Sequence, residues 1–333
     1  MCRQPSGPFG AASGGGRPAP TGLGGALRMT AFMVRRLISS GIMLFLVSLT
    51  VFLLGHLSGD PAMLMAPPQA TARDIAMLRQ SLGLDRPLHV QFLDFLAHAV
   101  QGDLGTSLAY RQPALSLVLE RMPATFSLST VGMLMAIAVA VPAGIFSALR
   151  PGSMVDAILS TASAVGQALP AYWIGIMLII VFAVQLGWFP AGGRDGASSL
   201  VLPAFTLALW PMARIARVLR SSLLDVLRAD FVRTARAKGL DERRVFLTHA
   251  LRNASIPVVT VMALTYGTIL GGTVITESVF AWPGVGRLAL EAVQNRDFPL
   301  MQATVFVVAC IFVAINFFLD LMYVWLDPRI RLR

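Results

Sequence analysis

The chain has 333 residues, of which 56% are hydrophobic and 13% are charged, and its mean hydropathy is +0.70. Soluble domains carry about 25% charged residues, so this chain has too few charges to cover a water-facing surface and is expected to be an integral membrane protein. Its 27 basic residues outnumber 17 acidic ones, but they are spread among apolar runs, which argues against a nucleic-acid partner.

Several kinds of catalytic and cofactor site are disfavoured by missing patterns. The one lysine, Lys238, is followed by Gly239 and Leu240, so the phosphate-binding pattern ending in Gly-Lys-Ser/Thr is absent. The four histidines do not fall at metal-ligand spacing, and neither His-Glu-x-x-His nor Gly-x-Ser-x-Gly occurs. Cys2 and Cys310 provide no disulfide framework. We therefore expect no catalytic residue, no metal, no cofactor and no enzymatic activity in this chain.

The chain begins with a segment rich in Gly, Pro, Ala and Ser, residues 1–32, which is expected to be a disordered extension. The first apolar run follows within residues 33–57 and is too long for a signal peptide. A hydrocarbon core ~30 Å thick needs about 20 apolar residues in a helix, and six segments meet or approach that length. The predicted spans are Leu37–Leu57, Phe126–Leu149, Ala157–Leu186, Leu200–Ala216, Ile256–Thr276 and Met301–Leu326.

The distribution of basic residues predicts the orientation of these spans. Placing both termini in the cytoplasm, including the tail at 327–333, puts 19 of the 27 basic residues inside and 8 outside. This is the positive-inside pattern, and it persists when the long first outside loop, residues 58–123, is left out. That loop contains a plausible surface helix at Ala70–Gly83. We therefore expect an all-α membrane protein with six spans.

The inside segment Ser221–Ser255 is long, strongly basic and helix-forming. A first helix is predicted to run to about Lys238 and to stop at Gly239, because glycine is best suited to a positive φ after a helix. Asp241 is a suitable N-cap for a second short helix. Ala235 and Gly239 lie four residues apart on one helix face, where their small size would admit another backbone. The sequence predicts two helices joined by a glycine corner along the cytoplasmic face.

The segment reads Arg-Thr-Ala-Arg-Ala-Lys-Gly-Leu at 233–240 and His-Ala-Leu-Arg-Asn at 249–253, and further motifs lie at 59–62, 82–87, 102–107, 280–287 and 327–331. With these motifs the chain resembles inner-membrane permeases of binding-protein-dependent ABC importers, whose coupling loop corresponds to this segment, and more narrowly the first permease subunit of the dipeptide, oligopeptide and nickel type. The alternative from the residues alone is a solvated basic loop near anionic lipid headgroups. The broader importer signature begins Glu-Ala-Ala, where this chain has Arg-Thr-Ala.

The resemblance implies a type I permease fold over residues 124–326 in the bacterial inner membrane. The chain would be a translocation subunit that pairs with a second related permease, two cytoplasmic ATPase subunits and an external substrate-binding protein. The outside loop would either help to receive that binding protein or only pack over the spans. A secondary transporter driven by an ion gradient is the alternative, although it would require inverted repeats. Dipeptide, oligopeptide, glutathione, nickel-complex and sugar systems share these motifs, so the solute is left open.

Two groups of residues are candidates for function. The resemblance assigns ATPase coupling to the basic segment, and Glu277–Arg287 is expected to form a tight external turn in which Trp282 is an interfacial anchor. Asn316 and Asp320 share a face of the last span and are expected to make structural hydrogen bonds. The candidates are Arg233, Thr234, Ala235, Arg236, Ala237, Lys238, Gly239 and Leu240 in the coupling loop, and Trp282, Pro283, Gly284 and Gly286 in the external turn.

Overall fold

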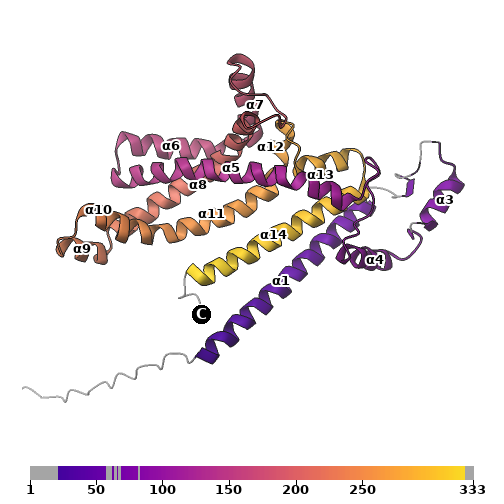
Figure 1. The fold of residues 1–333 in the computed structure, drawn as a ribbon, viewed down its shortest axis with the longest axis horizontal. Coiled ribbons are helices and arrows are strands. Elements are labelled where there is room, and N and C mark those ends of the chain that lie inside the picture. Colours follow the sequence, from indigo (N-terminus) through magenta and orange to yellow (C-terminus); the bar gives the residue numbers. More distant parts are fainter. Residues whose placement is uncertain (1–21, 58–61, 64–65, 67–68, 82, 327–333) are drawn as a thin grey trace, which may run out of the picture.

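The computed structural model describes residues 22–57, 62–63, 66, 69–81 and 83–326, which form a bundle of helices without a strand in these ranges (Figure 1). Within these ranges, five helices are long and apolar enough to cross a membrane, and a bent pair makes a sixth span if it is counted as one. The all-α, membrane-spanning fold is thereby confirmed. The spans correspond to α1 (Gly22–Leu57), α5 (Ala114–Leu149), the pair α6 (Met154–Ala168) and α7 (Ala171–Leu178), α8 (Val201–Leu227), α11 (Arg252–Gly272) and α14 (Phe298–Leu326).

Shorter helices gather at the two ends of the bundle (Figure 1). One end carries α9 (Asp230–Ala237) and α10 (Glu242–Arg244), and the opposite end carries α3, α4, α12 and α13. Helix α3 confirms the surface helix predicted at Ala70–Gly83, whereas α4 was not anticipated. These four helices are α3 (Ala72–Ser81), α4 (Leu88–Val100), α12 (Val274–Val279) and α13 (Val285–Gln294). The described elements also include two π-helical turns, Ile179–Gln185 and Val245–Leu251, and a 3₁₀ turn, Ser198–Leu200.

The predictions for the two termini are mostly outside the described part of the chain. Of the extension expected to be disordered, residues 1–21 lie outside the described residues and 22–32 belong to α1. The tail at 327–333 also lies outside them.

Helix α1 packs along α14 and reaches α4, where the rings of Phe52 and Phe92 are 5.4 Å apart between centroids.

The centre of the bundle is the close packing of α5 against α8. Four small residues recur at every fourth position of α5 and are buried: Gly132, Ala136, Ala140 and Gly144. A Cβ atom on Gly144 would lie 2.9 Å from the carbonyl oxygen of Ala216 on α8. Small side chains allow helix backbones in a membrane to approach closely, so this stripe fixes the α5–α8 pair.

The third predicted span, Ala157–Leu186, is not the continuous helix that its hydropathy suggested. Helices α6 and α7 meet at Leu169 and Pro170 with a bend of 105°, and α7 projects away from α6 in Figure 1. Leu169 is extended, with φ −81° and ψ 136°, because the residue before a proline avoids the helical region. Pro170 also has no N–H to donate to the preceding turn. The span is broken for these local reasons.

The fourth span is longer than predicted. Helix α8 continues past the expected end at Ala216 to Leu227, since arginines on its polar side do not interrupt helical hydrogen bonding. The helix expected to continue from Ser221 to Lys238 is instead interrupted at Arg228 and Ala229 before α9 begins.

Candidate functional site

The basic loop, residues 228–251, contains the predicted glycine corner. Helix α9 ends at Ala237, and Gly239 has a φ of +75°. The Leu240 N–H donates to the carbonyl of Ala235 at 3.4 Å, and the Gly239 N–H donates to that of Arg236 at 2.9 Å. These two bonds define a Schellman motif, in which a left-handed residue closes the helix. The glycine corner between α9 and α10 is confirmed.

The basic loop has a small apolar core of its own. Val232, Ala235 and Val245 are buried together, and Val226 and Leu240 pack against them. The face of α9 that carries Ala235 is therefore occupied by this chain, whereas an added Cβ on Gly239 would meet no atom within 4 Å. The expectation that Ala235 and Gly239 offer one open face was wrong. Glycine is required at 239 by its φ.

Charged side chains hold the corner and cover its outer surface. Arg236 forms a two-pronged pair with Glu242, with Nε–Oε1 at 2.7 Å and Nη2–Oε2 at 3.3 Å. The Asp241 carboxyl caps α10 by accepting from the Arg243 N–H at 3.1 Å. This pairing stiffens the corner across the glycine. The other predicted loop residues that lie exposed are Arg233, Thr234, Ala237 and Lys238.

Two apolar side chains of the basic loop that the sequence analysis did not single out are also exposed. Phe231 is 44% exposed and Leu247 is 50% exposed, although both belong to the same loop as the buried core. The signal was available in the amphipathic pattern of α9, where Phe231 precedes the core position Val232. An exposed aromatic residue on a charged surface is typical of a protein contact.

At the opposite end of the bundle, the Trp282 turn (residues 277–287) has a buried centre, although Ala281 is exposed. Trp282 is 2% exposed, packs with Leu128 and Ala204, and donates its indole N–H to the carbonyl of Ala124 at 2.9 Å. The interpretation of Trp282 as an interfacial anchor was therefore wrong. A buried indole N–H requires an acceptor, and the carbonyl of Ala124, next to Pro123 inside α5, supplies it.

The Trp282 turn is organised around Glu277, which is fully buried. The Thr125 hydroxyl donates to Glu277 Oε1 at 2.7 Å, and the Arg287 N–H donates to Oε2 at 2.9 Å. A Cβ on Gly284 would lie 2.3 Å from this carboxyl group, and one on Gly286 would lie 2.7 Å from a backbone atom of α12. Both predicted glycines are thus needed for close packing. Pro283 joins Trp282 to Gly284 within the same turn.

The loop at 101–113 is fastened to the same end. The Asp297 carboxyl is buried and accepts from the Ser107 hydroxyl at 2.5 Å and from the Ala109 N–H at 3.0 Å. The Tyr110 hydroxyl donates to Glu291 at 2.9 Å, and this hydrogen bond raises the pKa of the phenol. The motif at 102–107 therefore connects the N-terminal part of the chain to α13 and α14.

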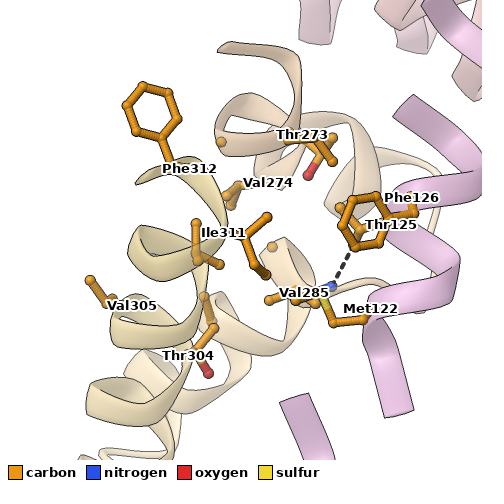
Figure 2. A pocket seen from close by; sticks show the side chains of 15 residues that line it. Met122, Thr125, Phe126, Thr273, Val274, Val285, Thr304, Val305, Ile311 and Phe312 are labelled. Atoms are coloured by element: carbon orange, nitrogen blue, oxygen red, sulfur yellow. Dashed lines mark hydrogen bonds between the residues drawn. The ribbon is translucent and has the colours of Figure 1, made fainter. Parts of the chain in front are cut away.

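A mostly apolar cavity of about 210 Å³ lies beside Glu277, between α5 and helices α11 to α14. Figure 2 shows Met122 and Phe126 on one side and Ile311 and Phe312 on the other, with the Thr125–Val285 hydrogen bond at its edge. None of its lining residues is titratable. The cavity can hold an apolar group but offers no acid or base for chemistry.

The chain matches two models of known protein families. Residues 140–332 match the model described as the binding-protein-dependent transport system inner membrane component, and residues 29–129 match the model described as the N-terminal part of a membrane component of such systems. The chain belongs to this family of inner-membrane permeases.

A second cavity, of about 410 Å³, lies in the permease between its basic loop and the ends of α5 and α8.

Curated relatives agree over almost the whole permease. It is 43% identical over 304 residues to the glutathione transport system permease protein GsiC of Escherichia coli O6:H1, which covers 91% of this chain and 99% of that protein. The proteins of the same name from Escherichia coli K12 and Salmonella choleraesuis SC-B67 are each 42% identical over 304 residues.

Solved structures share the fold of the permease. The MetNI methionine ABC transporter, in an inward-facing conformation, aligns with a TM-score of 0.52 and 18% identity over 63% of this chain and 96% of that chain. An amino acid ABC transporter solved with histidines aligns with a TM-score of 0.52 and 15% identity, over 62% of this chain and 92% of that chain. These structures give the permease the type I permease fold, and its family match and GsiC relatives make it a membrane subunit of an ABC importer. The ion-gradient alternative is not supported by these relatives.

The described residues also allow a search for metal sites and for the polar contacts of the last span. In the described part of the chain, no cluster of three His, Cys, Asp or Glu residues could hold a metal ion. Asn316 donates to the carbonyl of Phe312 at 2.8 Å, as expected for a structural hydrogen bond. The side chain of Asp320 lies outside the described residues.

Proposed function

We propose that the permease is the translocation subunit of an ATP-driven importer of small peptides, and that its basic loop docks on a separate cytoplasmic ATPase subunit. The observation that supports docking is the closed glycine corner with exposed basic and apolar side chains, which stands beyond the end of the bundle (Figure 1). A rigid, outward-facing corner can transmit displacement from a partner, whereas a flexible loop cannot.

The proposed assembly contains this permease, a second related permease as a heterodimer partner, two ATPase subunits and an external substrate-binding protein. The permease itself contributes no ATPase site. Both termini and the basic loop face the cytoplasm of a bacterial cell, and the Trp282 turn faces outward, as the distribution of arginines favours. The Trp282 turn and the loop at 101–113 then form a stiff external base on which the binding protein rests.

A peptide of the size of glutathione is the proposed solute class, because the curated relatives are named for glutathione transport. Competition for uptake by di- and tripeptides, with nickel complexes and sugars as comparisons, tests this part separately. Strong competition by a sugar but not by peptides would contradict it.

Substitution of Gly239 tests the docking. Asparagine tolerates positive φ and would project into the open space beside Gly239, so Gly239→Asn keeps the corner but obstructs the approach of a partner. We expect it to reduce ATP-dependent uptake in liposomes that contain the whole complex by at least about tenfold, a size typical of coupling between sites.

The matched control is Gly187→Asn, which also has positive φ and open space but lies outside the basic loop. It should transport normally. Cross-linking from a cysteine at exposed Arg233 should capture the ATPase subunit. Normal uptake by Gly239→Asn, or cross-links to lipid alone, would contradict docking. Uptake that stops when the proton gradient is collapsed, with ATP present, would instead favour an ion-driven transporter.

A further inference from the structure

Helix α6 is attached to the bundle in an unusual way. It runs beside α5 and α8 (Figure 1), yet Asp156 is its single buried residue, and the structure describes the whole helix. Most of its large apolar side chains face outward: Met154 is 79% exposed and Ile158 is 62% exposed. An apolar seam such as the one between α5 and α8 is therefore not what holds α6 in place.

The attachment is polar and is concentrated in the Asp156 cluster, which comprises Ser147, Gly152, Asp156 and Arg220. Arg220 on α8 forms a two-pronged pair with the Asp156 carboxylate, with Nε–Oδ1 and Nη2–Oδ2 both at 2.7 Å. The Asp156 side chain is 7% exposed and that of Arg220 is 32% exposed. Parallel bonds of this kind fix orientation as well as distance.

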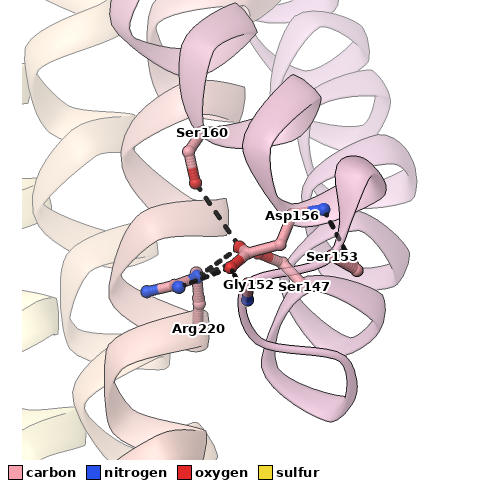
Figure 3. A network of polar contacts seen from close by, with 6 residues as sticks. All are labelled: Ser147, Gly152, Ser153, Asp156, Ser160 and Arg220. Carbon is pink, nitrogen blue, oxygen red and sulfur yellow. Dashed lines mark hydrogen bonds and ion pairs between the residues drawn. The ribbon is translucent and has the colours of Figure 1, made fainter.

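Further donors come from the end of α5 and the turn that follows it, and the Ser160 hydroxyl of α6 donates to Oδ1 at 3.5 Å. The Ser147 hydroxyl donates to Asp156 Oδ1, the Gly152 N–H donates to Oδ2 at 2.9 Å, and Arg220 Nε also donates to Ser147 at 2.9 Å. Figure 3 shows that these groups converge on one carboxylate from α5, α6 and α8. One side chain thus joins three helices.

The end of α5 and the start of α6, which carry Ser147 and Asp156, lie at the same end of the bundle as the basic loop (Figure 1). Arg220 is about two helical turns before the end of α8, and Val226, in the last turn of α8, packs against the core of the basic loop. A displacement of the basic loop therefore acts directly on the part of α8 that holds Asp156. The bent connection joins α6 to α7, so a movement of α6 is transmitted to α7, the second half of the broken span.

We infer that Asp156 and Arg220 are positioning residues that make α6 move together with α8 and the basic loop during transport. This inference rests on the proposed function, because the movement originates at the docked ATPase. Loss of the ion pair releases α6 from α8, so that movement of the basic loop no longer reaches α6 and α7. A purely structural role would lower the amount of assembled complex but leave each complex coupled.

The test compares solute transported per ATP hydrolysed in liposomes containing the full complex. Asp156→Asn removes the charge, and Arg220→Lys keeps the charge but loses the planar fork. Both variants should hydrolyse ATP while the transport ratio falls on the order of tenfold, within the range of coupling between sites. Arg217→Gln, an exposed arginine on α8 outside the cluster, is the control and should keep the ratio. An unchanged ratio in both cluster variants would overturn the inference.

A second measurement needs neither cluster variant. Spin labels at exposed Ile158 on α6 and Ser221 on α8, with native cysteines replaced by serine, report the separation of these helices. The distance should stay constant between nucleotide-free and ATP-bound states, and a shift would overturn the inference even if the variants fail to assemble. Absence of ATP-driven uptake by the unmodified complex would overturn the proposed function instead, and the labels would still report whether α6 follows α8.

Discussion

Glu277 shows how a single buried acceptor can organise a turn. Its carboxyl group receives the Thr125 hydroxyl and the Arg287 N–H, and Thr125 in turn accepts from the Val285 N–H at 2.8 Å. These groups come from α5, α12 and α13 and are shielded from water. A buried donor left without an acceptor costs about 1–3 kcal/mol, so the arrangement depends on this one side chain.

Glu277→Ala should therefore lower the midpoint of thermal unfolding of the purified permease in detergent, by the equivalent of at least about 2 kcal/mol. Glu277→Gln should lower it less, since glutamine retains one acceptor oxygen. Glu120→Ala changes an exposed glutamate on α5 and should stay within about 0.5 kcal/mol. Equal midpoints for Glu277→Ala and Glu120→Ala would refute the role of Glu277.

Individual residues were the hardest level to predict from the sequence. Gly239 was predicted correctly because its role is local: a helix end needs a residue that tolerates positive φ. Trp282 was misplaced because its acceptor, the carbonyl of Ala124, is 158 positions away in the chain. Hydropathy cannot distinguish a tryptophan at the membrane surface from one buried under a turn.

At the level of elements, the small residues of α5 set the distance to α8. Alanine normally stabilises a helix by about 0.5–1 kcal/mol relative to glycine. At Gly144 the added methyl group would meet the Ala216 carbonyl oxygen at 2.9 Å, whereas at Gly41 on α1 it would meet no atom within 4 Å. The same substitution should therefore have opposite effects at these two positions.

Gly144→Ala is expected to destabilise the permease by about 1–3 kcal/mol, the usual cost of overpacking. Gly41→Ala should be neutral or slightly stabilising. Unfolding midpoints of the two variants, measured side by side in the same detergent, make the comparison. Similar shifts in the same direction would show that helix propensity dominates and that the α5–α8 contact is not tight at Gly144.

The spans themselves were predictable because apolar length is a strong signal in a membrane. The path of each span was harder to predict than its length, although the sequence did contain the cause of the break between α6 and α7. Leu169 and Pro170 lie near the middle of the third predicted span, and a residue before proline favours an extended backbone. The size of the bend, 105°, depends on packing against other helices and could not be read from that pair.

At the level of the whole permease, orientation can be tested with single cysteines. Lys238→Cys lies on the basic loop and Asp195→Cys lies in the segment between α7 and α8, and both positions are exposed. In intact spheroplasts, a membrane-impermeant maleimide should label Asp195→Cys at once. It should label Lys238→Cys only after permeabilisation. The reverse pattern would place the basic loop outside the cell and would remove the basis for ATPase docking.

The broken span affects how long the permease survives in the membrane before it assembles with its partner subunits. Leu169, Pro170 and Ala171 are exposed in the single chain, and the last carbonyls of α6 have no following turn to pair with. Lipid cannot satisfy such groups, so they need cover from another subunit or from water. A permease without its partner subunit therefore leaves these polar groups uncovered. We expect membrane proteases to degrade it unless the second permease is synthesised at the same time.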